Sequence, residues 1–332
     1  MPTLYVIEPG ARLEKEYGRL LVTFEDEVIM RVPLQRVSEV VLVGNTGATT
    51  PALHALLNAG VSLFLVSRSG KLLGRLHSPL GANLPLRQAQ YRRNDDPEFT
   101  QELTRSIVAG KIRNQRVLVS RLARRRDHIP THGIEKLKAL QLAAERSVDT
   151  ADLLGIEGYA ARVYFAVYRE SLIGGWEFPR RTRRPPKDPV NALLSLGYTF
   201  LGHAAMAALE IVGLDPYLGF FHAEKYGRPA LALDLVEEFR APIVDSLVLD
   251  ILNHRLLDND DFEPGPKSEA IYLTPKGLRV FLTKFSQRLE SQITPREIGR
   301  PLSYRKLIEV QARKLANVIM GKENRYKTFQ AR

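Results

Sequence analysis

The sequence predicts an α+β fold in which a small N-terminal β-rich domain precedes a larger, all-α helical domain. Residues 1–80 hold short β-branched or alternating runs, such as Leu4–Ile7 and Val37–Val43, with glycines between them as turns. Beyond them, apolar residues recur at helical spacing through most of the 332-residue chain. We therefore expect a β-rich domain over 1–80, a linker over 81–97, a helical domain over 98–320 and a basic tail over 321–332.

Composition limits the classes of function. Lysine and arginine number 48 against 37 acidic residues, so the formal net charge is +11. That surplus suits a polyanionic partner, either a nucleic acid or an anionic membrane surface. The absence of cysteine excludes disulfides and thiolate metal sites. Because the N-terminal residues contain no apolar signal-peptide run, we expect a cytoplasmic protein.

The β-rich region is expected to combine short strands with one helix. Further strand-like runs lie at Arg19–Phe24 and Val28–Val32, and a helix begins near Pro51, since proline suits the first helical turn. Val61–Val66 and Lys71–His77 should pair as a hairpin. A domain this small leaves sheet faces exposed, so these faces are available for self-association.

Helical periodicity begins after the linker, which carries Gly81 and Pro85. Glu98–Arg126 has an apolar stripe, and later helices are expected over Leu278–Leu289 and Leu302–Met320. The tail beyond them is polar and basic, so we expect it to be partly disordered.

One predicted helix, Val190–Gly213, is long and mostly apolar, and Asp188 before it is suited to be its N-cap. A membrane span must be considered at this length. Polar side chains interrupt the apolar run, so we expect a buried core helix. His203 on it should be a core histidine rather than a metal ligand, whereas Asn191 and Tyr198 are expected to support the site described next.

A candidate site lies in Phe221–Arg240, where His222 precedes a turn and a short helix. Asp234 is one helical turn from Glu237 and Glu238, and like charges at this spacing destabilise a helix unless a cation neutralises them. A divalent metal with imidazole and carboxylate ligands would do so. The alternative is a solvated helix face with a hydrogen-bonded surface histidine. We place Glu238 on the solvated side.

A second candidate is Glu157, which lies in an otherwise apolar and small-residue segment. A buried glutamate is costly unless it is paired or binds a metal. The alternative is a first-turn glutamate stabilised by the helix dipole. Tyr164, Phe165 and Tyr168 mark this helix as part of the core, so we favour the metal site.

A basic, proline-rich loop follows the only tryptophan, Trp176, and lies between the two acidic motifs. Cations beside an aromatic ring suit phosphate neutralisation and base stacking, although a solvated connector is the alternative. The candidate DNA-binding residues are Arg180, Arg181, Arg183, Arg184 and Lys187, with Arg228 in the later turn.

Imidazole and carboxylate ligands suit Mn²⁺ or Mg²⁺, and such a site beside basic surface suits phosphodiester chemistry. The sequence contains no phosphate-binding loop for ATP. With a DNA 3′-hydroxyl as nucleophile the reaction is strand joining, and with water it is hydrolysis. A nuclease acting on branched DNA, and a non-catalytic DNA-binding scaffold, remain alternatives.

Four segments together, GIEGYAARVYF, PPKDPVNALLSLGY, FHAEKYGRPALALDLVEEFR and AIYLTPKG, closely resemble the CRISPR-associated spacer-acquisition integrase family, Cas-one. The resemblance implies that Glu157, His222 and Glu237 are metal ligands and that Asp234 is a further acidic site residue. It also implies a homodimer formed through the β domains. Integration of short double-stranded DNA fragments (spacers) into a CRISPR repeat, with a small ferredoxin-like partner, Cas-two, is the implied activity. No membrane association is implied.

Overall fold

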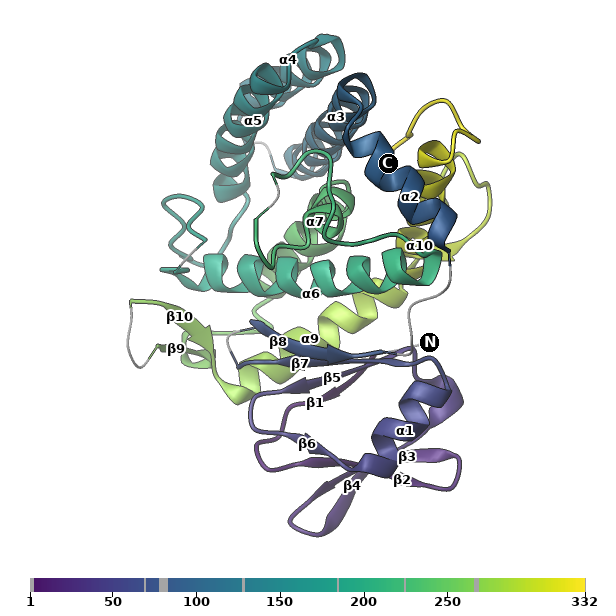
Figure 1. Cartoon of the computed structure of the whole chain (residues 1–332). Coiled ribbons are helices and arrows are strands. Elements are labelled where there is room, and N and C mark those ends of the chain that lie inside the picture. The colour runs from purple at the N-terminus through teal and green to yellow at the C-terminus, as the bar shows by residue number, and fades with distance from the viewer. Residues whose placement is uncertain are drawn as a thin grey trace.

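The computed structural model describes residues 3–68, 70–77, 83–126, 129–183, 185–223, 225–265 and 269–331. It places a strand-rich N-terminal region beneath a larger group of helices (Figure 1). The predicted α+β class is therefore confirmed.

Two four-stranded sheets and one helix form the N-terminal region. In the first sheet, parallel β1 (Thr3–Val6), β5 (Glu39–Val43) and β7 (Ser62–Val66) are followed by antiparallel β8 (Leu72–Leu76). The second sheet has the order β4 (Glu27–Pro33), β3 (Arg19–Phe24), β2 (Arg12–Glu16) and β6 (Gly47–Ala48), and helix α1 spans Thr50–Asn58. Apolar side chains from one face of each sheet and from α1 share one core.

The opposite face of the first sheet packs against the helices. Val41, Phe64 and Val66 on this face belong to the core of the helical region. Phe64 stacks on His203 with ring centroids 5.2 Å apart, so His203 is a core histidine as expected. The Arg305 guanidinium also reaches Glu39 on β5, at 3.2 Å. These contacts join the two regions into one packed unit.

The helical region contains two long helices, Pro97–Ala123 and Pro189–Val212, that contribute many side chains to its core. Its helices are α2 (Leu84–Asn94), α3 (Pro97–Ala123), α4 (His132–Arg146), α5 (Thr150–Glu170), α6 (Pro189–Val212), α7 (Ala230–Val236), a π-helical segment (Arg240–Asp245), α8 (Ser246–Asn253), α9 (Pro275–Glu290) and α10 (Tyr304–Ile319). Two short antiparallel strand pairs also lie in this region: β9 (Phe262–Pro264) pairs with β10 (Ile271–Leu273), and β11 (Gln292–Ile293) pairs with β12 (Leu302–Ser303). Single 3₁₀ turns lie at Leu34–Arg36 and Asn259–Asp261.

Helix α6 runs across the sheet at the centre of the molecule (Figure 1). Asp188 caps it, as predicted, by accepting a 2.8 Å hydrogen bond from the Asn191 amide. Its length and composition would allow a membrane span, but 72% of its most apolar window is buried inside the protein. It is therefore the core helix that the sequence predicts.

Two sequence expectations are wrong. Helix α2 lies inside the segment expected to be a linker, so the helical region begins at Leu84 rather than at residue 98. The tail is also ordered through residue 331, because Tyr326 and Phe329 are buried and Phe329 stacks on Phe239 at 5.6 Å. Two aromatic side chains among basic ones are enough to attach this short segment to the core.

Candidate functional site

The site is assembled around Asp234, a buried carboxylate on α7. Its Oδ2 accepts hydrogen bonds from the backbone amides of Phe220 at 2.6 Å and Phe221 at 3.0 Å. Its Oδ1 accepts from the His222 amide at 3.0 Å and from His222 Nδ1 at 2.7 Å. Asp234 therefore holds the loop before α7 in place and orients the imidazole.

This loop approaches α7 so closely that it needs glycine at one position. A Cβ at Gly219 would lie 2.7 Å from the Ala230 carbonyl carbon and 2.9 Å from Asp234 Oδ2. Both distances are far inside van der Waals contact, and the backbone of α7 cannot yield as a flexible side chain would. Gly219 is thus part of the architecture that lets Asp234 reach three consecutive amides.

The hydrogen bond to Asp234 decides which nitrogen of His222 is free. Because Asp234 accepts at Nδ1, the Nδ1 atom carries the proton and the Nε2 lone pair faces away from Asp234. Nε2 lies 3.5 Å from Glu237 Oε1. A carboxylate behind a histidine ring is the usual way to orient and strengthen an imidazole ligand.

Glu237 is buried and lies between two cations. Arg240 Nη2 is 3.0 Å from its Oε1, and Lys111 Nζ is 2.7 Å from its Oε2. Burial alone would raise the pKa of Glu237, but the neighbouring cations Arg240 and Lys111 lower it from 4.5 to about 2. Glu237 is therefore a carboxylate throughout the physiological pH range.

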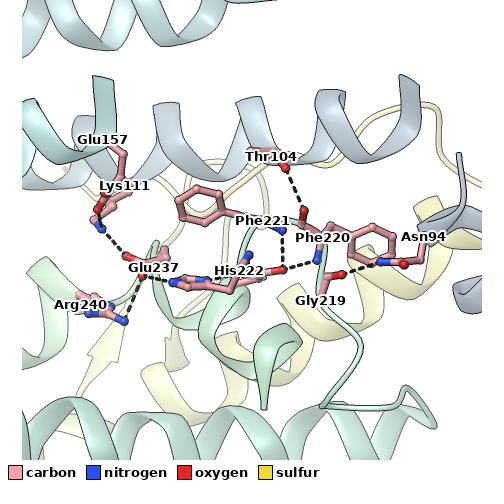
Figure 2. Close-up of polar contacts among 11 residues, drawn as sticks. Asn94, Thr104, Lys111, Glu157, Gly219, Phe220, Phe221, His222, Glu237 and Arg240 are labelled. Carbon is pink, nitrogen blue, oxygen red and sulfur yellow. Dashed lines mark hydrogen bonds and ion pairs between the residues drawn. The ribbon is translucent and has the colours of Figure 1, made fainter. Parts of the chain in front are cut away.

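Glu157 reaches this centre through Lys111. The Lys111 ammonium, in the middle of α3, contacts Glu157 on α5 as well as Glu237 (Figure 2). Lys111 is 5% exposed, so it has little water to solvate its charge. The structure thus brings His222, Asp234 and Glu237 into direct contact and joins Glu157 to them through one ammonium.

Lys111 and Arg240 are the site residues that sequence reasoning missed. Arg240 follows Glu237 at i,i+3, a spacing at which opposite charges meet on a helical turn, so this pair could have been inferred. Lys111 is the one charged side chain within the buried run Ile107–Ile112 of α3. A lysine in such a run indicates a buried partner, but the sequence does not say which one.

The groups that could hold a divalent ion are His222 Nε2 and the carboxylates of Glu237 and Glu157. Their mixture of nitrogen and oxygen donors suits Mn²⁺ or Mg²⁺, and Asp234 is already used in orienting His222. Among the described residues, no three histidine or acidic side chains lie close enough together to bind a metal as they stand. Between Glu157 and Glu237 lies the ammonium of Lys111 instead.

Glu238 was expected to lie on a solvated face, but it is buried. It is 2% exposed and accepts hydrogen bonds from the Tyr326 hydroxyl, from Gln311 Nε2 at 2.8 Å and from the Phe329 amide. Burial raises its pKa from 4.5 to about 7. Helical periodicity predicted the wrong environment for Glu238 for two reasons. Helix α7 ends at Val236, and the C-terminal tail covers the side that was expected to face water.

Of the two expected supporting residues, Tyr198 lies close to the site and Asn191 does not contact it. The Arg240 guanidinium lies over the Tyr198 ring, 4.6 Å from its centroid, and the Tyr198 hydroxyl donates to Asp245 at 2.6 Å. Asn191 instead accepts from Arg181 Nη1 at 2.7 Å. Asn191 therefore orders the basic loop.

The basic loop divides into inward and outward cations. Arg181 donates to Asn191 and Ser195, and burial lowers its pKa, so it anchors the loop. The other cations of the loop that the structure describes are exposed: Arg180, Arg183 and Lys187, of which Lys187 pairs with Glu269 at 2.6 Å. Arg228 is half-buried, and Arg184 lies outside the described residues.

Comparisons with known proteins agree on one family. The family model for CRISPR associated protein Cas1 matches residues 4–287. A CRISPR-associated endonuclease Cas1 of Thermus thermophilus is 38% identical over 336 residues, which cover 99% of this chain and 97% of that protein.

Two solved structures are similar in fold. A casposase bound to its integration product has a TM-score of 0.85 at 24% identity, over 98% of this chain and 93% of the casposase chain. A chain of a Cas6-RT-Cas1–Cas2 complex has a TM-score of 0.82 at 28% identity, over 99% of this chain and 36% of that chain. The first likeness is evidence for the fold only.

Proposed function

Because the chain belongs to the CRISPR-associated protein Cas1 family, we propose that it is a divalent-metal-dependent DNA endonuclease and integrase of CRISPR adaptation. It would insert short DNA fragments into the CRISPR array. A fragment's 3′-hydroxyl attacks a phosphodiester of the repeat, a new phosphorus–oxygen bond forms, and the 3′-oxygen of the cleaved repeat strand leaves and takes up a proton. The observation that carries this proposal is the convergence of His222, Glu237 and, through Lys111, Glu157.

His222 Nε2, Glu157 and Glu237 are the proposed ligands of Mn²⁺ or Mg²⁺. When bound, such an ion polarises the scissile phosphate and lowers the pKa of the attacking hydroxyl or water. Asp234 fixes the orientation of the His222 ring by accepting hydrogen bonds from both its Nδ1 and its backbone amide. Arg240 neutralises one oxygen of Glu237 and fixes its rotamer.

DNA would be held by the exposed arginines of the basic loop. Arg180 and Arg183 are exposed, and phosphate contacts of this kind supply affinity without reading sequence. We also propose a homodimer formed through the β-rich region, and a Cas2 partner. The second proposal is supported by the similar chain that forms part of the Cas6-RT-Cas1–Cas2 complex.

The decisive experiment offers the purified protein, with Mn²⁺, a short duplex and a plasmid carrying the CRISPR repeat. A duplex with free 3′-hydroxyls should be joined to the plasmid, and the same duplex ending in 3′-dideoxynucleotides should not. In a parallel reaction with a branched DNA, cleavage of that DNA by a protein that does not join the duplex to the plasmid would favour the nuclease alternative. DNA binding with neither reaction would favour a non-catalytic scaffold.

The ligand assignment is tested by Glu157→Ala, His222→Ala and Glu237→Ala. Each should abolish joining and hydrolysis, because loss of one ligand weakens binding of the metal ion. The bound ion stabilises the transition state by several kcal/mol. DNA affinity should change little, because these side chains bind the ion rather than the phosphate backbone. A variant that keeps wild-type activity would remove its residue from the site.

A further inference from the structure

The Lys111 ammonium lies where both proposed carboxylate ligands can reach it. It contacts Glu157, and its Nζ is 2.7 Å from Glu237 Oε2. The other oxygen of Glu237 faces Arg240 at 3.0 Å. Two carboxylates and two cations therefore balance without any bound ion, which matters because an uncompensated buried charge is strongly destabilising.

The position of Lys111 sets this pairing apart from a surface salt bridge. The side chain starts from the interior of α3 and is 6% exposed, and Glu237 is 2% exposed. Glu157, at 18% exposed, is the most accessible of the three side chains. A flexible four-carbon stem allows an ammonium to move between partners, which the rigid fork of an arginine does not.

From this arrangement we propose that Lys111 is the protein's own counter-cation at the metal site. It keeps Glu157 and Glu237 together while no divalent ion is bound, and it competes with that ion for the same carboxylates. The proposal rests on the proposed function, because it assumes that these carboxylates are ligands. It assigns Lys111 a positioning role, since the lysine acts through Glu157 and Glu237.

If Lys111 competes with the ion, its removal should change the stability of the metal-free protein and the affinity for the ion in opposite directions. Removing the ammonium should destabilise the metal-free protein, since two carboxylates then face each other with one cation missing. The same removal should strengthen ion binding, because the ion no longer has to displace a positive charge. A lysine that only supports the fold would, when removed, weaken both properties together.

The test compares wild-type protein with Lys111→Met, which keeps the length of the stem. In EDTA, the thermal midpoint of Lys111→Met should fall by about 5 °C or more. Its Kd for Mn²⁺, measured by titration while the electron paramagnetic resonance signal of free Mn²⁺ is monitored, should be lower by about tenfold or more. Lys306→Met is the matched control, because Lys306 pairs with Glu309 on the exposed side of α10 and should change neither quantity.

A double variant, Lys111→Met with Glu157→Gln, covers the case in which Lys111→Met folds poorly. It removes one charge of each sign, so its metal-free midpoint should recover toward the wild-type value. A double variant no more stable than the single one would overturn the proposal. So would an unchanged midpoint in Lys111→Met, or Mn²⁺ binding that is equal to or weaker than in wild type.

These outcomes separate the proposal from the function on which it rests. If wild-type protein and Lys111→Met both fail to bind Mn²⁺, the proposed metal site fails, and the competition fails with it. If wild type binds Mn²⁺ and Lys111→Met binds it no more tightly, only the role of Lys111 is refuted.

Discussion

Glu238 allows a quantitative prediction, because its carboxylate is buried without a cation in direct contact. Its partners are the Tyr326 hydroxyl, Gln311 Nε2 and the Phe329 amide, all hydrogen-bond donors. Burial is the largest effect on this group, and it raises the pKa from 4.5 to about 7. Ionisation of Glu238 therefore costs more in the folded protein than in the unfolded chain.

The sign of the pH dependence follows from which state holds the proton. Between pH 4.5 and about 7 the folded protein keeps a proton that the unfolded chain has already released, so the free energy of unfolding falls as pH rises. Over that interval the loss amounts to about 3 kcal/mol, at roughly 1.4 kcal/mol for each pH unit. Below pH 4.5 the contribution is fully present.

Glu238→Gln should remove this pH dependence. With its carbonyl in the place of Oε2, glutamine still accepts from Gln311 and the Phe329 amide. Its amino group then donates to the Tyr326 hydroxyl, which can rotate to accept. The variant should match wild type near pH 4.5 and be more stable by about 2 to 3 kcal/mol at pH 8.

Urea denaturation at pH 5 and pH 8, followed by fluorescence of Trp176, measures the difference. Glu177→Gln is the control, because it neutralises an exposed carboxylate beside the same tryptophan. The reasoning is refuted if Glu238→Gln and wild type differ by the same amount at both pH values. It is equally refuted if the variant loses stability at pH 8, because the carboxylate would then be the preferred form.

Three further predictions follow from other contacts. Asp234→Asn should reduce joining about 10- to 100-fold, because an amide cannot accept from every donor that meets Asp234, and excess Mn²⁺ should restore part of the activity in a rate assay. Arg183→Ala should make the negative slope of log K against log salt for DNA binding shallower by about 0.9. Arg181→Ala should leave this slope unchanged and lower the thermal midpoint, because Arg181 anchors the loop. Deleting the chain from Arg325 onward removes the buried ring of Phe329 and should cost about 3 kcal/mol or more of unfolding free energy, measured in urea.

Local sequence patterns determined the class of fold and were enough to group most residues of the candidate site. Strand alternation and helical periodicity were sufficient for the α+β class. The Asp188 N-cap was also predictable, because a cap depends on residues within one turn. His222, Asp234 and Glu237 could be grouped because they lie within one short stretch, where chain geometry limits how far apart they can be.

Only the tertiary structure decided which charges neutralise this site. Lys111 meets Glu157, a residue 46 positions later, on another helix, and no local spacing specifies that encounter. The environment of Glu238 was hidden for the same reason, since its donors come from α10 and from a tail that is remote in sequence. Helical periodicity states which side of a helix a residue occupies, but packing decides whether that side meets water or protein.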